Sequence, residues 1–311
     1  MTLRVVLTGA TGLIGRRISA ILVETGARVA ALCRSPERAA RVLGNEVTLE
    51  PWDFARPQRG HWRERLGDAD AVIHLAGTPL FSHRWSPEFK QEMERSRVES
   101  TRQLVEAMGQ ARQRPSCFVS ASAVGIYGLD PELEADEQTP PAEDTLARLC
   151  RAWEAEALQA EALGIRTALV RTGIVLSTES GALKEMLPLF RLGLGGVLGE
   201  RRPWVSWVHL EDAARLYLMA LLHPQARGPI NAVAPNPVRN ELLAQTVAKV
   251  LRRPCALRYP TALMRLGIGE AADFASGGPR VHCRRAEALG YEFRFPELEP
   301  AIRNLLGRPK R

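Results

Sequence analysis

The chain has 311 residues, 45% of them hydrophobic, and a formal net charge of +7, which is the composition of an ordinary globular protein. No apolar run approaches the ~20 residues of a membrane span, and the first apolar run meets a glycine turn too early for a signal peptide. The basic excess is almost entirely scattered arginine without interleaved aromatic residues, so we expect neither a membrane nor a nucleic acid as partner.

A strand, a glycine turn and a helix open the chain. Residues 3–7 are apolar and rich in β-branched side chains, which predicts a buried parallel strand, and residues 14–23 carry apolar side chains at helical spacing. Gly9 allows the tight turn, Gly12 lets backbone N–H groups approach a pyrophosphate, and Gly15 lets the helix pack closely. An ordinary strand–turn–helix is the alternative, but this context favours a nucleotide site.

The next predicted strand, residues 28–33, ends where such folds discriminate between NAD and NADP. A carboxylate at this point accepts hydrogen bonds from the adenosine ribose, whereas an arginine pairs with the 2′-phosphate of NADP. Arg34 and Ser35 follow the strand, and the first carboxylate is Glu37. A solvated turn arginine is the alternative. Given the glycine turn upstream, the sequence favours NADP.

Short strands and helices alternate along the rest of the chain. Strands are predicted at 47–49, 69–75, 116–120, 166–171 and 230–233, with a strand-like stretch at 204–209. Helices are predicted at 87–112, 145–163, 181–192 and 210–222, a strand-free surface loop at 130–144, and a flexible loop at 193–196. This alternation predicts an α/β fold, a doubly wound parallel sheet of the Rossmann type, with ligands at the carboxyl ends of the strands.

The predicted domain organisation is discontinuous. We expect residues 1–176, with 206–235 returning to them, to form the nucleotide-binding domain. Residues 177–205 and 236–311 should form a smaller substrate domain, whose tail holds two or three helices and short strands. The cleft between the two is the expected substrate site. The five cysteines are widely spaced, which predicts reduced thiols in a cytoplasmic protein, without a disulfide or a structural metal.

Short motifs in a fixed order run along essentially the whole chain: residues 8–15 (TGATGLIG), 74–77 (HLAG), 84–85 (RW), 96–97 (SR), 120–128 (SASAVGIYG), 150–154 (CRAWE), 171–176 (RTGIVL), 190–196 (FRLGLGG), 207–209 (WVH) and 231–235 (NAVAP). Together they resemble the atypical extended short-chain dehydrogenase/reductases called the epimerase family, including their C-terminal module. The resemblance implies NADP as cofactor. It assigns cofactor binding to Gly9, Thr11, Gly12, Leu13, Ile14, Gly15, Arg34, Ser35, Leu75, Ala76, Gly77, Glu92, Arg97 and Ile174.

The usual catalytic pair of that superfamily, Tyr-x-x-x-Lys, is missing, because no tyrosine here has a lysine four residues later. The aligned positions hold Cys150 and Glu154. A carboxylate raises the pKa of a neighbouring thiol, although Glu154 could accept hydrogen bonds from ribose hydroxyls. The catalytic candidates are therefore Ser122, which aligns with the superfamily serine, and Tyr127 on the same loop. The alternative for Ser122 is a turn-stabilising hydroxyl, and the alternative for Tyr127 is a plain core residue or a hydrogen-bonded wall.

Five further residues allow two interpretations each. Asp53 either approaches the adenine amino group or caps a turn. His209 is expected to be structural rather than a base. Trp85, Trp204 and Trp207 either line the cleft or belong to the core.

The sequence leaves two main functions open. The first is an NADP-dependent oxidoreductase or epimerase that acts on a small molecule, with a sugar as one option. The alternative is a non-catalytic NADP(H)-binding redox sensor or regulatory protein, since the Tyr-x-x-x-Lys pair is absent. Nucleic-acid binding through the basic balance is the weakest reading. A homodimer is a further expectation, because members of this superfamily habitually dimerise.

Overall fold

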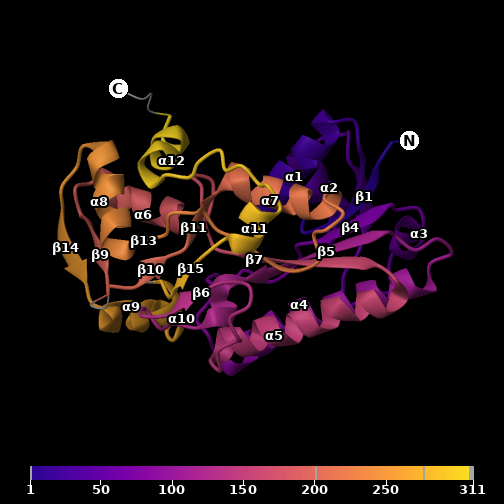
Figure 1. Cartoon of the computed structure of the whole chain (residues 1–311), viewed down its shortest axis with the longest axis horizontal. Helices are drawn as coiled ribbons and strands as arrows, with labels where there is room; N and C mark the ends of the chain where they lie inside the picture. Colours follow the sequence, from indigo (N-terminus) through magenta and orange to yellow (C-terminus); the bar gives the residue numbers. More distant parts are fainter. Residues whose placement is uncertain (1, 200–201, 276, 308–311) are drawn as a thin grey trace.

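Seven parallel strands form the central sheet of the protein, in the order β12-β7-β5-β4-β1-β2-β3 (Figure 1). The structure is a computed structural model that describes residues 2–199, 202–275 and 277–307. The strands are β1 Arg4–Thr8, β2 Arg28–Cys33, β3 Thr48–Pro51, β4 Ala71–His74, β5 Cys117–Ala123, β7 Arg166–Thr172 and β12 Gly228–Ala232. The strand order reverses between β1 and β4, so the predicted doubly wound Rossmann fold is confirmed.

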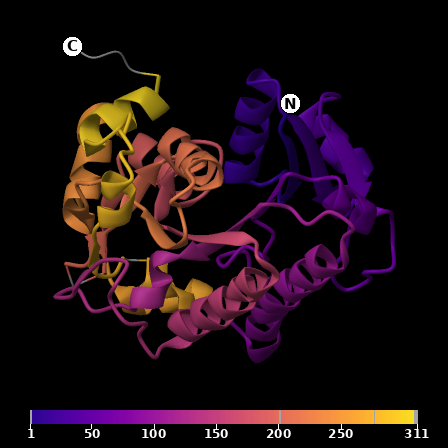
Figure 2. The same ribbon diagram turned by 45° about the vertical axis from the view of Figure 1, so that its right-hand side comes forward.

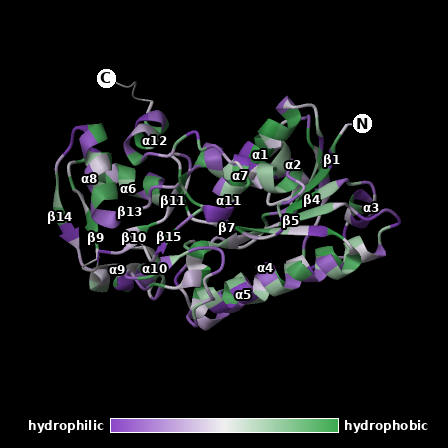
Figure 3. Ribbon diagram, in the orientation of Figure 1, coloured by the Kyte–Doolittle hydropathy of each residue, from purple (hydrophilic) through white to green (hydrophobic). Residues whose placement is uncertain are grey.

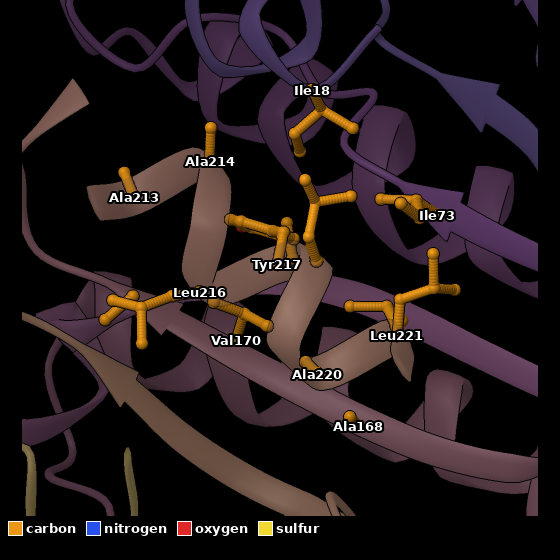
Figure 4. Close-up of a cluster of buried hydrophobic side chains, with 14 of the residues drawn as sticks. Ile18, Ile73, Ala168, Val170, Ala213, Ala214, Leu216, Tyr217, Ala220 and Leu221 are labelled. Carbon is orange, nitrogen blue, oxygen red and sulfur yellow. The ribbon is translucent and has the colours of Figure 1, made fainter. Parts of the chain in front are cut away.

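Helices cover both faces of the sheet, because successive side chains of its strands are apolar on either face. Val5 of β1 packs with α1 (Leu13–Glu24) and α7 (Leu210–Leu222), whereas Val6 packs on the opposite face with α3 (Trp62–Gly67) and α4 (Pro87–Gln110). Figure 4 shows Tyr217 and Leu221 of α7 among Ile18 and Ile73 in the first of these cores. Beside α4 runs α5 (Thr145–Leu158), as Figure 2 shows. The short α2 (Pro36–Leu43) follows β2.

A second region with its own hydrophobic core stands beyond β7 and β12 (Figure 1). Its core side chains include Leu187, Trp207, Val247 and Ile302. The elements here are β8 Ile174–Leu176, α6 Ala182–Arg191, β9 Gly195–Leu198, β10 Trp204–Val205, β11 Trp207–His209, β13 Val238–Arg239, α8 Asn240–Leu251, β14 Cys255–Tyr259 and α12 Leu298–Leu305. The predicted smaller domain also spans residues 200–201, 276 and 308–311, which lie outside the described residues.

Three local expectations were wrong. Residues 193–196 are not simply a loop, because β9 pairs in parallel with β14; a Cβ on Gly196 would lie 2.5 Å from the carbonyl oxygen of Leu257, so only glycine allows this approach. The loop 130–144 contains β6 (Glu134–Ala135), which pairs with β15 (Arg280–Val281) far along the chain. The tail was expected to hold two or three helices. Its described residues instead form α8, α12 and three short helices, which are α9 Thr261–Ile268, α10 Ala271–Ala275 and α11 Arg284–Ala288.

Polar and apolar residues alternate along α4 in the hydropathy colouring (Figure 3). Within the described ranges, no helix combines the length and the apolar character that crossing a membrane requires.

Candidate functional site

A cavity of about 280 Å³ lies at the carboxyl ends of β1, β4, β5 and β7. This is the edge where open α/β sheets bind ligands. The cavity brings together eight of the predicted site residues: Gly9, Gly12, Leu13, Ile14, Gly15, Leu75, Arg97 and Ser122. Apolar side chains that the sequence did not single out, among them Leu80, Leu146 and Leu149, complete the wall together with Trp153.

The glycine turn is built by close backbone approaches that exclude a side chain. Gly9 has φ +67°, and a Cβ there would lie 2.7 Å from the carbonyl carbon of Leu75 at the end of β4. A Cβ on Gly15 would lie 2.3 Å from the carbonyl oxygen of Gly9, so α1 packs directly against the turn. Gly12 begins α1 without a side-chain cap, and the first helical turn carries no acidic residue. The N–H groups at this helix end can therefore serve an anion.

A buried chain of hydrogen bonds ties this turn to α4. The Thr8 hydroxyl oxygen accepts the backbone N–H groups of Leu75 and Ala76, both at 3.2 Å, so its proton is directed to Nδ1 of His74 at 2.7 Å. Nε2 of His74 then donates to Oγ of Ser100 on α4, at 3.2 Å. Burial lowers the pKa of His74 to about 3, which keeps the ring neutral. This series of hydrogen bonds fixes α4 relative to the glycine turn.

Arg97 on α4 brings a buried positive charge to the cavity. The residue is 8% exposed, and its guanidinium donates to the carbonyl oxygens of Met93 (3.2 Å) and Thr78 (3.0 Å). Among the described residues it forms no ion pair with a carboxylate. Burial lowers its pKa to about 10, so the group stays charged at neutral pH. A Cβ on Gly77 would lie 3.1 Å from Cζ of Arg97, which explains the small residue there.

A buried polar network stands behind the other wall. Glu154 of α5 accepts two hydrogen bonds from Arg171 of β7, both at 2.8 Å, and a third from the Ser122 hydroxyl at 2.6 Å. Arg171 also donates to the Tyr127 hydroxyl (2.9 Å), which itself donates to the side-chain oxygen of Asn231 (2.8 Å). Because the Ser122 proton is directed to Glu154, the lone pairs of its oxygen are left for the cavity.

The structure distinguishes the two catalytic candidates. Ser122 lines the cavity, whereas Tyr127 is 1% exposed and is not part of the cavity wall. Burial raises the pKa of Tyr127 to about 12, despite the neighbouring Arg171. This geometry favours a buried, hydrogen-bonded structural role for Tyr127. Burial, with the charge of Glu154, likewise raises the pKa of the cavity-lining Cys150 to about 12, so it is a neutral thiol.

Thr11, Ala76, Gly77, Glu92 and Ile174, which were also predicted to bind the cofactor, do not line the cavity. Thr11 is exposed on the glycine turn, and Ala76 and Gly77 follow Leu75. Glu92 lies on α4 and accepts the Thr78 hydroxyl at 3.1 Å. Ile174 packs against the second core, and its neighbour Val175 reaches the cavity instead.

The two residues predicted to read the 2′-phosphate lie at the end of β2. Arg34 is exposed, and its side chain has no ion-pair or hydrogen-bond partner in the described part of the chain. Ser35 donates to the carboxylate of Glu37 at 2.9 Å.

The five residues with two interpretations make the following contacts. Asp53 accepts the backbone N–H of Ala55 at 3.1 Å, as a turn cap does. Nδ1 of His209 accepts the N–H of Glu211 at the start of α7, and its ring stacks on Phe295, so its expected structural role is confirmed. None of the three tryptophans in question lines the cavity: Trp85 and Trp207 are core residues, and Trp204 lies between Arg239 and Arg280.

Comparisons with known proteins agree with this architecture. Residues 5–233 match the model of the NAD dependent epimerase/dehydratase family, and residues 259–305 match a domain of unknown function, DUF1731. The chain is 38% identical over 304 residues to "Epimerase family protein SDR39U1 homolog, chloroplastic" of Arabidopsis thaliana, covering 96% of this chain and 85% of that protein. It is 32% identical over 311 residues to epimerase family protein YfhF of Bacillus subtilis, covering 99% of both.

A solved structure shows the same likeness. The crystal structure of human epimerase family protein SDR39U1 (isoform 2) with NADPH superposes with a TM-score of 0.85 at 30% identity, covering 98% of this chain and 99% of that one. The resemblance inferred from the short motifs is thus confirmed. The chain belongs to the NAD-dependent epimerase/dehydratase family, among the extended short-chain dehydrogenase/reductases that carry the DUF1731 domain.

Proposed function

We propose that the chain binds NADP(H) and uses it as an oxidoreductase or epimerase on a small substrate, with a sugar as one option. The observation that carries this proposal is Arg97, a buried guanidinium without a carboxylate partner among the described residues, in the same cavity as the glycine turn. A buried charge needs compensation, and a pyrophosphate supplies it. The NADPH in the human SDR39U1 structure gives independent support.

The residues present fit this cofactor. The turn brings backbone segments close together at Gly9 and Gly15, where no Cβ fits, and it offers the free N–H groups of α1 to the phosphates. Arg97 adds a cation at the cavity, and the unpaired Arg34 supplies one for the adenosine 2′-phosphate. When bound, NADP(H) supplies or accepts a hydride at C4 of the nicotinamide.

Ser122 and Glu154 provide the proton chemistry in this proposal. With its own proton directed to Glu154, Ser122 accepts a hydrogen bond from a substrate hydroxyl. It can then take the hydroxyl proton while its own proton passes to the Glu154 carboxylate. Arg171 fixes that carboxylate through two hydrogen bonds, which keeps the acceptor oxygen aligned on Ser122. Glu154 stands at the position of the missing lysine, and Ser122 at the position of the superfamily serine.

The alternative, a non-catalytic NADP(H)-binding redox sensor or regulatory protein, has one observation in its favour. Of the described titratable groups that line the cavity, Cys150 and Arg97 have pKa values of about 12 and about 10, and burial raises that of Tyr217 further. None of these groups titrates near neutral pH, where general acid–base catalysts are usually tuned.

Two measurements test the proposal. Calorimetric titration should show NADPH binding more tightly than NADH, with the preference lost in Arg34→Glu and binding lost in Gly12→Asp. Gly12 has an ordinary φ of −73°, and a Cβ there would approach the carbonyl oxygen of Gly9 at 3.2 Å, so an aspartate requires a small backbone adjustment while its charge repels the phosphates. NADPH deuterated at C4 is then incubated with the protein and a cell metabolite extract, with Gly12→Asp as control.

Each outcome separates the candidates. Deuterium in one small molecule, only with the intact turn, supports the oxidoreductase. A changed stereochemistry without net label identifies an epimerase that returns its hydride to the same molecule. Tight NADPH binding without either change favours the sensor. An absence of NADPH binding refutes both.

A further inference from the structure

The indole N–H of Trp153 is a buried hydrogen-bond donor without a partner among the described residues. Trp153 lies on α5, is 5% exposed and lines the cavity. Leaving a buried donor unpaired is unfavourable, and most buried polar groups in proteins have a partner. An unpaired donor in a cavity wall therefore points to a ligand that supplies the acceptor.

Other buried tryptophans of this chain show that the fold can satisfy such a group. The indole N–H of Trp62 donates to the carbonyl oxygen of Pro57 at 2.9 Å, that of Trp85 to Leu80 at 2.7 Å, and that of Trp207 to Asn236 at 3.0 Å. Trp52 also has an unpaired N–H, but it does not line the cavity. Trp153 alone, among the described tryptophans, combines an unpaired N–H with a place in the cavity wall.

The surroundings of Trp153 indicate what kind of acceptor is missing. The guanidinium carbon of Arg97 lies 5.3 Å from the centre of the Trp153 ring, so both side chains belong to one part of the wall. The Trp153 ring also meets the His74 ring edge-on, and His74 belongs to the hydrogen bonds that fix α4. A cation over the ring that carries an unpaired N–H donor suits a group rich in oxygen, such as a phosphate or a ribose. Neither side chain offers an acceptor of its own.

We propose that Trp153 donates its indole N–H to an oxygen of the nicotinamide-side phosphate or ribose of bound NADP(H). The inference rests on the proposed cofactor. It makes Trp153 a cofactor-binding residue, one position before Glu154, which stands where the superfamily has its lysine. It also implies that the donor is satisfied only in the complex, so removing it should weaken the complex without weakening the free protein.

The test replaces the N–H without changing the shape of the side chain. The isosteric amino acid 3-benzothienylalanine, which has sulfur in place of the N–H, is introduced at position 153, alongside the simpler variant Trp153→Phe. The matched control is the same replacement at position 207, where the N–H already donates to a carbonyl oxygen. Titration calorimetry with NADPH and with 2′,5′-ADP, and thermal unfolding of the free protein, are measured for each.

We expect opposite results at the two positions. Benzothienylalanine at 153 should weaken NADPH binding about tenfold and leave the unfolding midpoint of the free protein unchanged or higher. At 207 it should lower the midpoint and leave NADPH affinity within about twofold. The affinity for 2′,5′-ADP, which lacks the nicotinamide-ribose half, should not change at either position. Trp153→Phe should lose at least as much NADPH affinity as the isostere does.

Three results would overturn the inference. NADPH affinity within about twofold of wild type for the 153 isostere would show that the N–H does not bind the cofactor. An equal loss of 2′,5′-ADP affinity would show an indirect effect. A fall in the midpoint of the free protein as large as that at 207 would show that the N–H is already paired. If wild-type protein fails to bind NADPH at all, the proposed cofactor itself is wrong, and this inference falls with it.

Discussion

Substituting Arg171→Met should disrupt the buried polar network behind the cavity and lower the free energy of unfolding substantially. The ion pair between Arg171 and Glu154 is buried, with side chains only 8% and 9% exposed, and it contains two hydrogen bonds of 2.8 Å. Methionine fills much of the same space but leaves the Glu154 carboxylate uncompensated and removes a donor to the Tyr127 hydroxyl. Removing one partner of a buried pair typically costs about 3–5 kcal/mol. We expect a loss of that size in the free energy of unfolding.

Urea unfolding followed by tryptophan fluorescence measures this loss. Arg151→Met is the matched control, because Arg151 pairs with Glu143 on the surface, where both side chains are exposed, and should show no measurable change. The double variant Glu154→Leu/Arg171→Met should be less destabilised than Arg171→Met alone, since it leaves no buried charge. A loss below about 1 kcal/mol for Arg171→Met, or strictly additive losses in the double variant, would refute the view that the two charges depend on each other.

Three further predictions concern the turn, the sheet and pH. Gly9→Ala should abolish NADPH binding in calorimetry, since its φ of +67° and the 2.7 Å approach to Leu75 exclude a Cβ; unchanged affinity would contradict the close approach. Gly196→Ala should separate β9 from β14 and speed amide hydrogen exchange across 255–259, whereas unchanged exchange would show that the backbone adapts. His74 has a pKa of about 3 in the folded protein and an ordinary pKa near 6.5 in the unfolded chain. Its contribution to the free energy of unfolding is therefore fully present above pH 6.5. That contribution is lost as the pH falls toward 3, at up to about 1.4 kcal/mol per pH unit. Unfolding measured against pH should therefore be steeper for wild type than for His74→Gln, and equal slopes would place the neutral ring in doubt.

The elements that sequence periodicity describes well are those whose side chains face one continuous core. The predicted ranges of β2 and α7 coincide with the observed ones, because their apolar spacing is regular and their ends carry clear signals. By contrast, β6 is two residues long and exists only because β15 pairs with it from 146 residues away. A local pattern carries no information about such a partner.

The same distinction holds for the site. The glycine turn and the strand-end positions follow from the fold, so Gly9, Leu75 and Ser122 could be placed at the cavity from the sequence alone. The partner of Glu154 could not, because Arg171 comes from a different element and nothing in the spacing selects it. Trp153 lies in the CRAWE motif beside Glu154, yet a buried tryptophan gives no sign in the sequence of whether its N–H is paired.

The pairing of β6 with β15 has a consequence for how the protein is made. Synthesis at 5–20 residues per second separates the two strands by roughly 7–30 s, during which the seven-stranded sheet can already be complete through β12. Over that interval β6 has no neighbour. Strand β12, which completes the sheet, is made about two thirds of the way through it, and from then on the side chain of Asn231 lacks the carbonyl oxygen of His282 to which it donates at 2.9 Å. In the last third of the interval the nascent chain therefore holds a complete sheet without the β6–β15 pair, which forms once residues 280–282 leave the ribosome.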